Sequence, residues 1–115
     1  MTYVILHNPN CSTSRKGLDL LKEAGIEPEV RKYMNVSEQL TVEELKDIAK
    51  KMGGVSPRSF LRAKDAPAAG IDSASSDEAI FEAMAANPKL IQRPIGIKGK
   101  RAVLGRPPED LLKLA

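Results

Sequence analysis

The fold of this chain is decided by residues 7–15, His7-Asn8-Pro9-Asn10-Cys11-Ser12-Thr13-Ser14-Arg15, which join two segments of different hydrophobic pattern. Before them, residues 3–6 form a short apolar run that is typical of a buried strand. After them, residues 16–24 carry leucines and end at Gly25, which predicts a helix with its stop signal. Cys11 is therefore expected in a turn just before a helix N-terminus. Free backbone N–H groups and the helix dipole favour a thiolate or a bound oxyanion at such a place.

Cys11 is the only cysteine of the chain, and His7 is the only histidine. A lone cysteine is more often a small buried hydrophobic residue than a nucleophile. Here its neighbours are polar, and Ser12, Thr13 and Ser14 carry hydroxyl groups that donate hydrogen bonds. On the residues alone, both a core cysteine and a reactive thiol remain open.

Length and composition limit the class of protein. The 115 residues fit one domain, and a hydrophobic content of 42% is enough for a globular core. A single cysteine cannot form an intrachain disulfide, and the chain has neither a secretory signal nor an apolar run near the ~18 residues of a membrane span. We therefore expect a reduced, cytoplasmic protein with no membrane partner.

The charge pattern and the few aromatic residues argue against a nucleic-acid partner. The formal net charge is +3, with the two signs mixed along the chain. Aromatic residues make up 3%, and tryptophan is absent, so a base-stacking platform is not expected. A small anionic molecule would be favoured modestly. No bound metal or cofactor is expected.

The middle of the chain is predicted to be mostly helical. Residues 29–33 form a second, less regular strand candidate, and strand–helix–strand in so few residues implies parallel pairing. Thr41 with Glu44, and Ser75 with Glu78, match the capping-box pattern of two helices. Residues 56–61 begin with Ser-Pro, which predicts a short helix between them.

The last third returns to strands. Residues 90–92 and 95–97 flank Arg93-Pro94, residues 98–100 suit a hairpin turn, and residues 102–104 form the returning strand. A short helix is expected after Arg106 and the two prolines that follow it. The whole order predicts an α/β protein with a four-stranded mixed sheet and a helical insertion.

This chain resembles the glutaredoxin-coupled arsenate reductase family over nearly its whole length. The resemblance rests on four ordered segments: residues 7–15, Ser59-Phe60-Leu61-Arg62, Leu90-Ile91-Gln92-Arg93-Pro94-Ile95 and Gly105-Arg106-Pro107. It implies one thioredoxin-like domain over residues 1–115, with a cis peptide bond before Pro94.

The resemblance also implies an enzyme with Cys11 as the nucleophile that attacks arsenate. It assigns the oxyanion and its cysteine adduct to three arginines and two hydroxyl residues of the turn: Arg62, Arg93, Arg106, Ser12 and Thr13. It assigns His7 and Ser14 to keeping the thiolate stable. The chemistry agrees, because guanidinium groups hold tetrahedral anions through paired hydrogen bonds and lower a nearby thiol pKa. The arginines at positions 31, 58 and 101 are expected to be solvated surface charges.

With one cysteine, the thiol that resolves the adduct must come from another molecule. The resemblance implies glutathione as an external reductant, followed by glutaredoxin, with no cofactor bound to the chain. Two departures are notable. Ser12 stands where the family's arsenate reductases commonly have glycine, so its Cβ could narrow the anion loop. Ser14 stands where related redox-sensing regulators, which bind RNA polymerase, have a second cysteine.

Two other functions remain open on the sequence. The first is a regulator or adaptor of the same fold that binds a protein partner through the helical insertion. The second is a glutathione-linked reductase that acts on a substrate other than arsenate.

Overall fold

Four strands form one mixed sheet in the order β2-β1-β3-β4. They are β1 (Tyr3–Leu6), β2 (Glu29–Arg31), β3 (Ile95–Lys98) and β4 (Arg101–Leu104). β1 pairs in parallel with β2 and antiparallel with β3, and β3 pairs antiparallel with β4. The computed structural model describes residues 2–114, apart from the side chain of Val36. The four-stranded mixed sheet expected from the sequence is confirmed.

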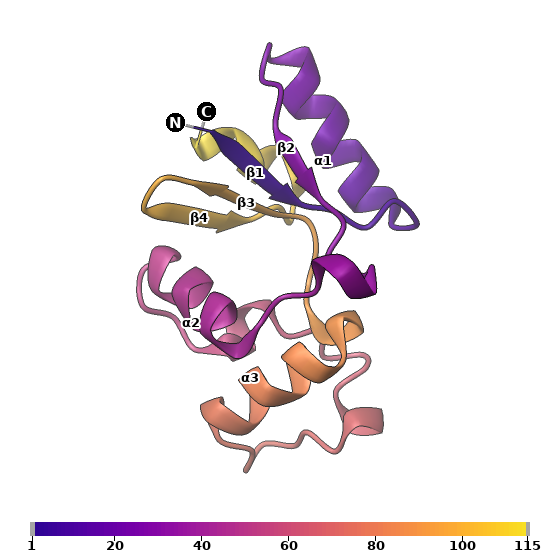
Figure 1. Cartoon of the computed structure of the whole chain (residues 1–115), viewed down its shortest axis with the longest axis vertical. Helices are drawn as coiled ribbons and strands as arrows, with labels where there is room; N and C mark the ends of the chain where they lie inside the picture. Colours follow the sequence, from indigo (N-terminus) through magenta and orange to yellow (C-terminus); the bar gives the residue numbers. More distant parts are fainter. Residues whose placement is uncertain (1, 115) are drawn as a thin grey trace.

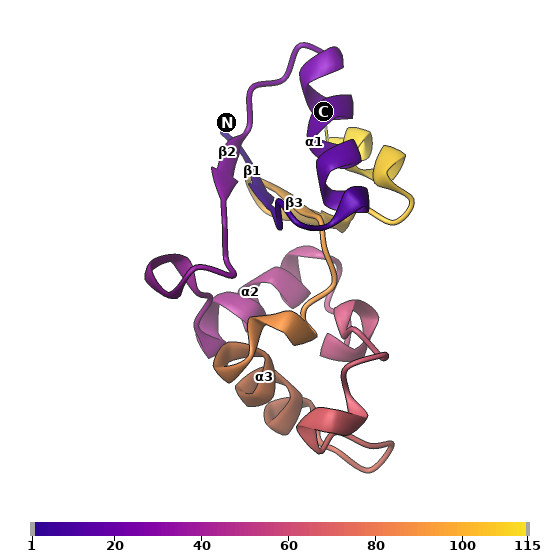
Figure 2. The same cartoon turned by 90° about the vertical axis from the view of Figure 1, so that its right-hand side faces the viewer.

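Helices cover both faces of this sheet (Figure 1). On one side lie α1 (Ser12–Glu23) and the C-terminal 3₁₀ helix η5 (Pro108–Leu114). On the other side lies the helical insertion between β2 and β3, and Figure 2 shows it below the sheet in the turned view. Its elements are η1 (Val36–Glu38), α2 (Val42–Lys51), η2 (Pro57–Phe60), η3 (Pro67–Ala69), α3 (Asp77–Ala86) and η4 (Pro88–Leu90).

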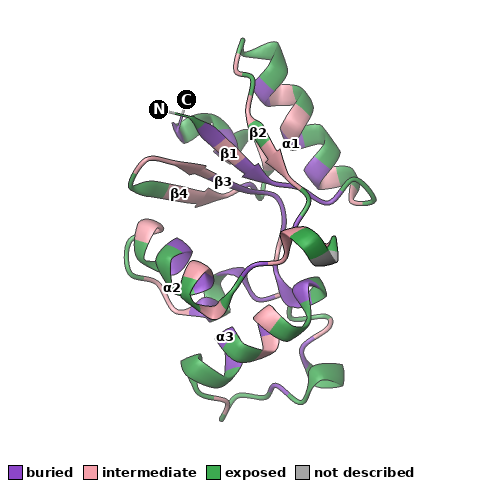
Figure 3. Cartoon of the chain, in the orientation of Figure 1, coloured by how far each residue is buried: buried purple, intermediate pink, exposed green. Residues whose placement is uncertain are grey.

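Alternate side chains of β1 enter two separate hydrophobic clusters, one on each face of the sheet. Figure 3 shows that most of β1 is buried. Tyr3 and Ile5 pack with Leu21 of α1 and with η5. Leu6 packs with the larger cluster under the insertion, which includes Tyr33. The two tyrosines of the chain therefore lie on opposite sides of the sheet.

Several local predictions were wrong in detail. Residues 90–92 are not a strand: η4 ends at Leu90, and Ile91 forms only an isolated antiparallel bridge with Leu61. Pro88 and Pro94 have no N–H to donate, and Asn87 caps η4, so this apolar run is buried without joining the sheet. β2 stops at Arg31, two residues before its predicted end.

Helix starts also differ from the sequence pattern. Ser76, not Ser75, is the N-cap of α3, and its Oγ accepts the N–H of Ala79 at 3.1 Å. The capping box of Thr41 and Glu44 is confirmed. The short segments after Ser56 and near the C-terminus are 3₁₀ rather than α-helices. α1 begins at Ser12, four residues earlier than the leucine spacing indicated.

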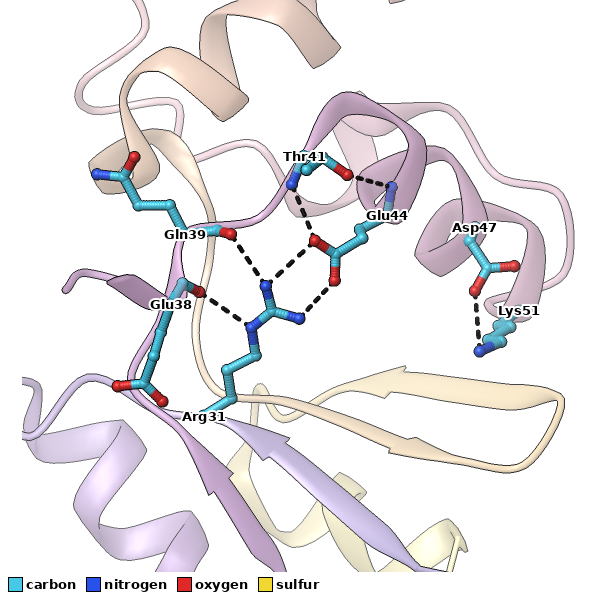
Figure 4. A network of polar contacts seen from close by, with 7 residues as sticks. All are labelled: Arg31, Glu38, Gln39, Thr41, Glu44, Asp47 and Lys51. Atoms are coloured by element: carbon cyan, nitrogen blue, oxygen red, sulfur yellow. Dashed lines mark hydrogen bonds and ion pairs between the residues drawn. The ribbon is translucent and has the colours of Figure 1, made fainter. Parts of the chain in front are cut away.

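Arg31 is not a solvated surface charge (Figure 4). It donates to the carbonyl oxygens of Glu38 (3.0 Å) and Gln39 (2.9 Å) and pairs through two nitrogens with the Glu44 carboxylate. This contact ties the end of β2 to the start of α2. Arg58 is likewise bound, because its Nη2 donates to two backbone carbonyls near the start of α3. Arg101 is exposed, as expected. Within residues 2–114, no helix combines the length and the apolar character that crossing a membrane requires.

Candidate active site

Cys11 is the N-cap residue of α1, with an extended backbone of φ −102° and ψ 122°. Its N–H donates to the carbonyl oxygen of Asn8 at 3.0 Å, and its own carbonyl oxygen accepts the N–H of Arg15 at 3.0 Å. The side chain of Asn8 also supports the turn, since Oδ1 accepts the N–H of Asn10 at 3.0 Å. The predicted position, a turn between a strand and a helix N-terminus, is confirmed.

Ser14 joins the two ends of this turn. It is fully buried, and its Oγ lies 2.8 Å from Nδ1 of His7 and 3.1 Å from the N–H of Asn8, which it accepts. His7 and Asn8 are themselves buried, with exposed fractions of 5% and 6%. His7, Asn8 and Ser14 therefore form a buried hydrogen-bonded network within the turn that carries Cys11.

The environment of Cys11 favours its thiolate. Partial burial of the sulfur opposes ionisation, but the backbone N–H groups of Ser14 and Thr13 and the Arg93 guanidinium together lower the pKa of Cys11. Burial also lowers the pKa of His7, and the charges of Lys32 and Lys22 add to this effect. His7 is thus neutral near pH 7, and the positive charge at the sulfur comes from Arg93.

Arg93 is a buried cation, with an exposed fraction of 5%. Its Nη1 donates to the carbonyl oxygens of Lys89 and Ile91, each at 3.2 Å. Its Nε is buried and has no hydrogen-bond partner within the structure. A buried, unpartnered N–H of a guanidinium is costly unless a ligand accepts from it, so Arg93 is prepared for an anion.

Arg106 is attached to the same segment. Its Nε donates to the carbonyl oxygen of Arg93 at 3.0 Å. The absence of a side chain at Gly105 lets the two segments lie this close, because a Cβ there would be 2.8 Å from Pro94 Cγ. The peptide bond before Pro94 is cis, as predicted, and the one between Arg106 and Pro107 is cis as well.

Arg62 lies on the segment that pairs with the residues just before Arg93, since its N–H donates to the carbonyl oxygen of Leu90 at 2.7 Å. It follows the bridge between Leu61 and Ile91, and its Nε lies 3.4 Å from Oδ2 of Asp65. That Asp65 oxygen is buried and, within residues 2–114, accepts no hydrogen bond of normal geometry. The Arg62 guanidinium is therefore held by a loose ion pair that a better acceptor can replace.

Ser12 and Thr13 form the first turn of α1. Ser12 is exposed, and only glycines among residues 2–114 have a positive φ. A serine is therefore accommodated after Cys11 without backbone strain. The N–H of Thr13 faces the sulfur and contributes to lowering its pKa.

Sequence reasoning missed three residues of this region: Asn8, Asp65 and Tyr33. Tyr33 is fully buried, and the charges of Arg93, Cys11 and Arg62 all act on its hydroxyl. A signal for it existed, because Tyr33 follows β2 and the carboxyl ends of the parallel strands β1 and β2 meet at one edge. The described residues contain no cluster of three or more His, Cys, Asp or Glu side chains suited to a metal ion.

The chain belongs to the ArsC family, whose family pattern it matches over residues 6–114. It is 40% identical over 117 aligned positions to an arsenate reductase of Haemophilus influenzae, covering 99% of each chain. It is 42% identical over 113 positions to the uncharacterized protein YfgD of Escherichia coli, covering 96% of this chain and 93% of YfgD. An arsenate reductase from Vibrio cholerae has the same fold, with a TM-score of 0.90, 43% identity, and coverage of 100% and 98%. The thioredoxin-like fold is thus confirmed.

Proposed function

We propose that this protein reduces arsenate to arsenite, with the Cys11 thiolate as the nucleophile. The observation that carries the proposal is the pairing of a thiol of lowered pKa with a buried arginine whose Nε lacks an acceptor. Membership of the ArsC family, with relatives named arsenate reductase at about 40% identity, supports the same reaction.

In the first step the thiolate attacks arsenic, a sulfur–arsenic bond forms, and one arsenate oxygen leaves as water. Arg93 holds the oxyanion through its Nε and its charge. Arg62 and Arg106 close around it from the two neighbouring segments, and the N–H groups of Ser12 and Thr13 supply the helix N-terminal donors. These site assignments are part of the proposal.

His7 and Ser14 act on the turn rather than on arsenic. Their buried hydrogen bond keeps the Ser14 and Thr13 N–H groups directed at the sulfur. The neutral His7 adds no competing cation and is not assigned a proton-transfer role.

Reduction of As(V) to As(III) requires two electrons, which two thiols supply as they become a disulfide. Because Cys11 is the only cysteine, at least one of these thiols comes from another molecule. We propose glutathione as that thiol and glutaredoxin as the protein that reduces the resulting mixed disulfide. No cofactor bound to this chain is needed, and the proposed place of action is the cytoplasm.

The test is arsenate reduction by the purified protein with glutathione and glutaredoxin, compared with thioredoxin and its reductase. We expect turnover with glutaredoxin and none from the Cys11→Ser variant, because a serine hydroxyl is a far weaker nucleophile at neutral pH. Turnover with thioredoxin alone would contradict the proposed reductant. Equal turnover by Cys11→Ser would contradict the mechanism, and absence of turnover in every system would contradict the substrate.

A further inference from the structure

The hydroxyl of Tyr33 lies next to Arg93, yet the proposed reaction makes no use of it. Tyr33 is fully buried, and its Oη donates to the carbonyl oxygen of Ile91 at 3.4 Å. Nη1 of Arg93 donates to the same carbonyl oxygen at 3.2 Å. The Ile91 carbonyl is thus shared by a phenol and a guanidinium.

The segment that contains Ile91 also pairs with the segment that carries Arg62. The N–H of Arg62 donates to the carbonyl oxygen of Leu90 at 2.7 Å, and the N–H of Gln92 donates to that of Phe60 at 2.8 Å. These bonds turn the Leu90 carbonyl and the Gln92 N–H toward residues 60–62, so the Ile91 carbonyl between them points to the other side, where it accepts from Tyr33 and Arg93. A hydroxyl at this point can affect the geometry of Arg93, which shares the carbonyl.

Tyr33 remains protonated at neutral pH, since burial raises its pKa to about 12. The charges of Arg93, Cys11 and Arg62 act on the phenol in addition to burial, so its oxygen lies within electrostatic range of all three. At neutral pH it is a hydrogen-bonding group and not a base.

Packing alone does not explain the hydroxyl. The ring lies in the large apolar cluster, where phenylalanine would fill the same space. The bond to Ile91 is long, so it returns little of the desolvation that burying the hydroxyl requires. A buried hydroxyl with so weak a hydrogen bond therefore indicates that the Tyr33 hydroxyl acts on Arg93.

We propose that Tyr33 is a positioning residue for Arg93: its hydroxyl, sharing the Ile91 carbonyl, fixes the guanidinium so that its unpartnered Nε stays available to an oxyanion at Cys11. Long arginine side chains reach a precise geometry only when neighbouring groups restrict their rotamers. The inference rests on the proposed function only in placing the oxyanion between Cys11 and Arg93.

Tyr3 provides a matched control, because it is the other of the two tyrosines in the chain. It is also buried, at 4% exposure, and its Oη donates to the carbonyl oxygen of Leu111 at 2.7 Å. It lies in the cluster on the opposite face of the sheet. Tyr3→Phe therefore removes a buried tyrosine hydroxyl without touching the Cys11 region.

The experiment compares Tyr33→Phe with Tyr3→Phe in the full chain. Two quantities are measured: the pH midpoint for alkylation of Cys11 by an uncharged reagent, and the phosphate concentration that halves the alkylation rate at fixed ionic strength. We expect Tyr33→Phe to raise that concentration about 3- to 10-fold, the effect of one net hydrogen bond, and to move the midpoint to higher pH. Tyr3→Phe should change neither quantity, even if urea unfolding shows it to be less stable.

A double-mutant cycle tests whether Tyr33 acts through Arg93. In an Arg93→Met background, Tyr33→Phe should produce no additional change in the alkylation midpoint. Additive effects would overturn the proposal. Unchanged values for Tyr33→Phe would overturn it, because the hydroxyl would then have no effect on Arg93. Equal effects of the two tyrosine variants, or a Tyr33→Phe protein that does not fold, would also overturn it, because the hydroxyl would then be a general structural group.

These readouts separate the inference from the proposed function. If the wild-type protein does not reduce arsenate, the proposed function fails while alkylation still reports on Tyr33 and Arg93. If the wild type reduces arsenate and Tyr33→Phe keeps the wild-type midpoint and phosphate protection, only the role of Tyr33 fails.

Discussion

Replacing Ser14 with alanine is expected to destabilise the protein far more than the loss of one hydroxyl group at a surface. Ser14 Oγ is the partner of both the Asn8 N–H and His7 Nδ1, at 3.1 and 2.8 Å. In Ser14→Ala both groups stay buried and lose this partner, because the exposed fractions of Asn8 and His7 are 6% and 5%. Each unsatisfied buried group costs about 1–3 kcal/mol, and the better helix propensity of alanine returns a few tenths. The expected loss is therefore about 1.5–5.5 kcal/mol.

The assay is urea unfolding followed by circular dichroism, with Ser12→Ala as the control. Ser12 lies in the same helix but is exposed, so its replacement should stay within about 0.5 kcal/mol of wild type. The freed turn should also let the N–H groups of Ser14 and Thr13 move from the sulfur, raising the alkylation midpoint of Cys11. If Ser14→Ala is as stable as Ser12→Ala, the buried network does not support the turn and the reasoning is refuted.

Three further predictions concern charged and titrating groups. Arg93→Lys keeps the charge but loses the planar guanidinium, so protection of Cys11 by phosphate should weaken by about 1–3 kcal/mol; unchanged protection would place the anion elsewhere. Arg31 lowers the pKa of Glu44, so this pair stabilises the fold above the Glu44 pKa of the unfolded chain and is lost as pH falls through the lowered value. The free energy of unfolding of Arg31→Met should therefore depend less on pH in that window than that of the wild type. The same pH dependence in both proteins would contradict the pairing. His7 has a lowered pKa in the fold, so its neutral form stabilises the protein above about 6.5 and stability falls as pH drops below that value. His7→Asn should remove this slope in urea titrations from pH 7 down to the lowered folded pKa.

Much of the fold could be predicted from local pattern. The apolar run of β1, the polar turn and the leucines of α1 place Cys11 at a helix N-terminus without any tertiary information. The capping box of α2 and the hairpin of β3 and β4 were also predicted, because caps and tight turns depend on neighbouring residues. The predictions failed at residues 90–92, where an apolar run fits a strand or a buried turn equally well.

The residues of the candidate site are likewise of two kinds: some are neighbours in sequence, and others are brought together by packing. Cys11, His7 and Ser14 lie within eight residues, so the sequence alone brought them together in one turn. Arg93 was singled out only through the family resemblance, since seven arginines look alike in sequence. Arg31 and Arg58 were expected in solvent. Arg31 instead connects β2 to the start of the insertion, and Arg58 connects two segments within the insertion.

What only the tertiary structure decided is which of these groups share one environment. Arg93 is 82 residues from Cys11 in sequence, yet its charge acts on the sulfur, and Tyr33 shares its carbonyl partner at Ile91. Burial, unpartnered atoms and pKa shifts arise from long-range packing of β1, β2 and the insertion, and no local pattern encodes them. Local sequence therefore determined where the one thiol lies and the turn that holds it. Packing across the sheet edge determined the charge that prepares it, because electrostatic and desolvation effects depend on distance in space and not on separation along the chain.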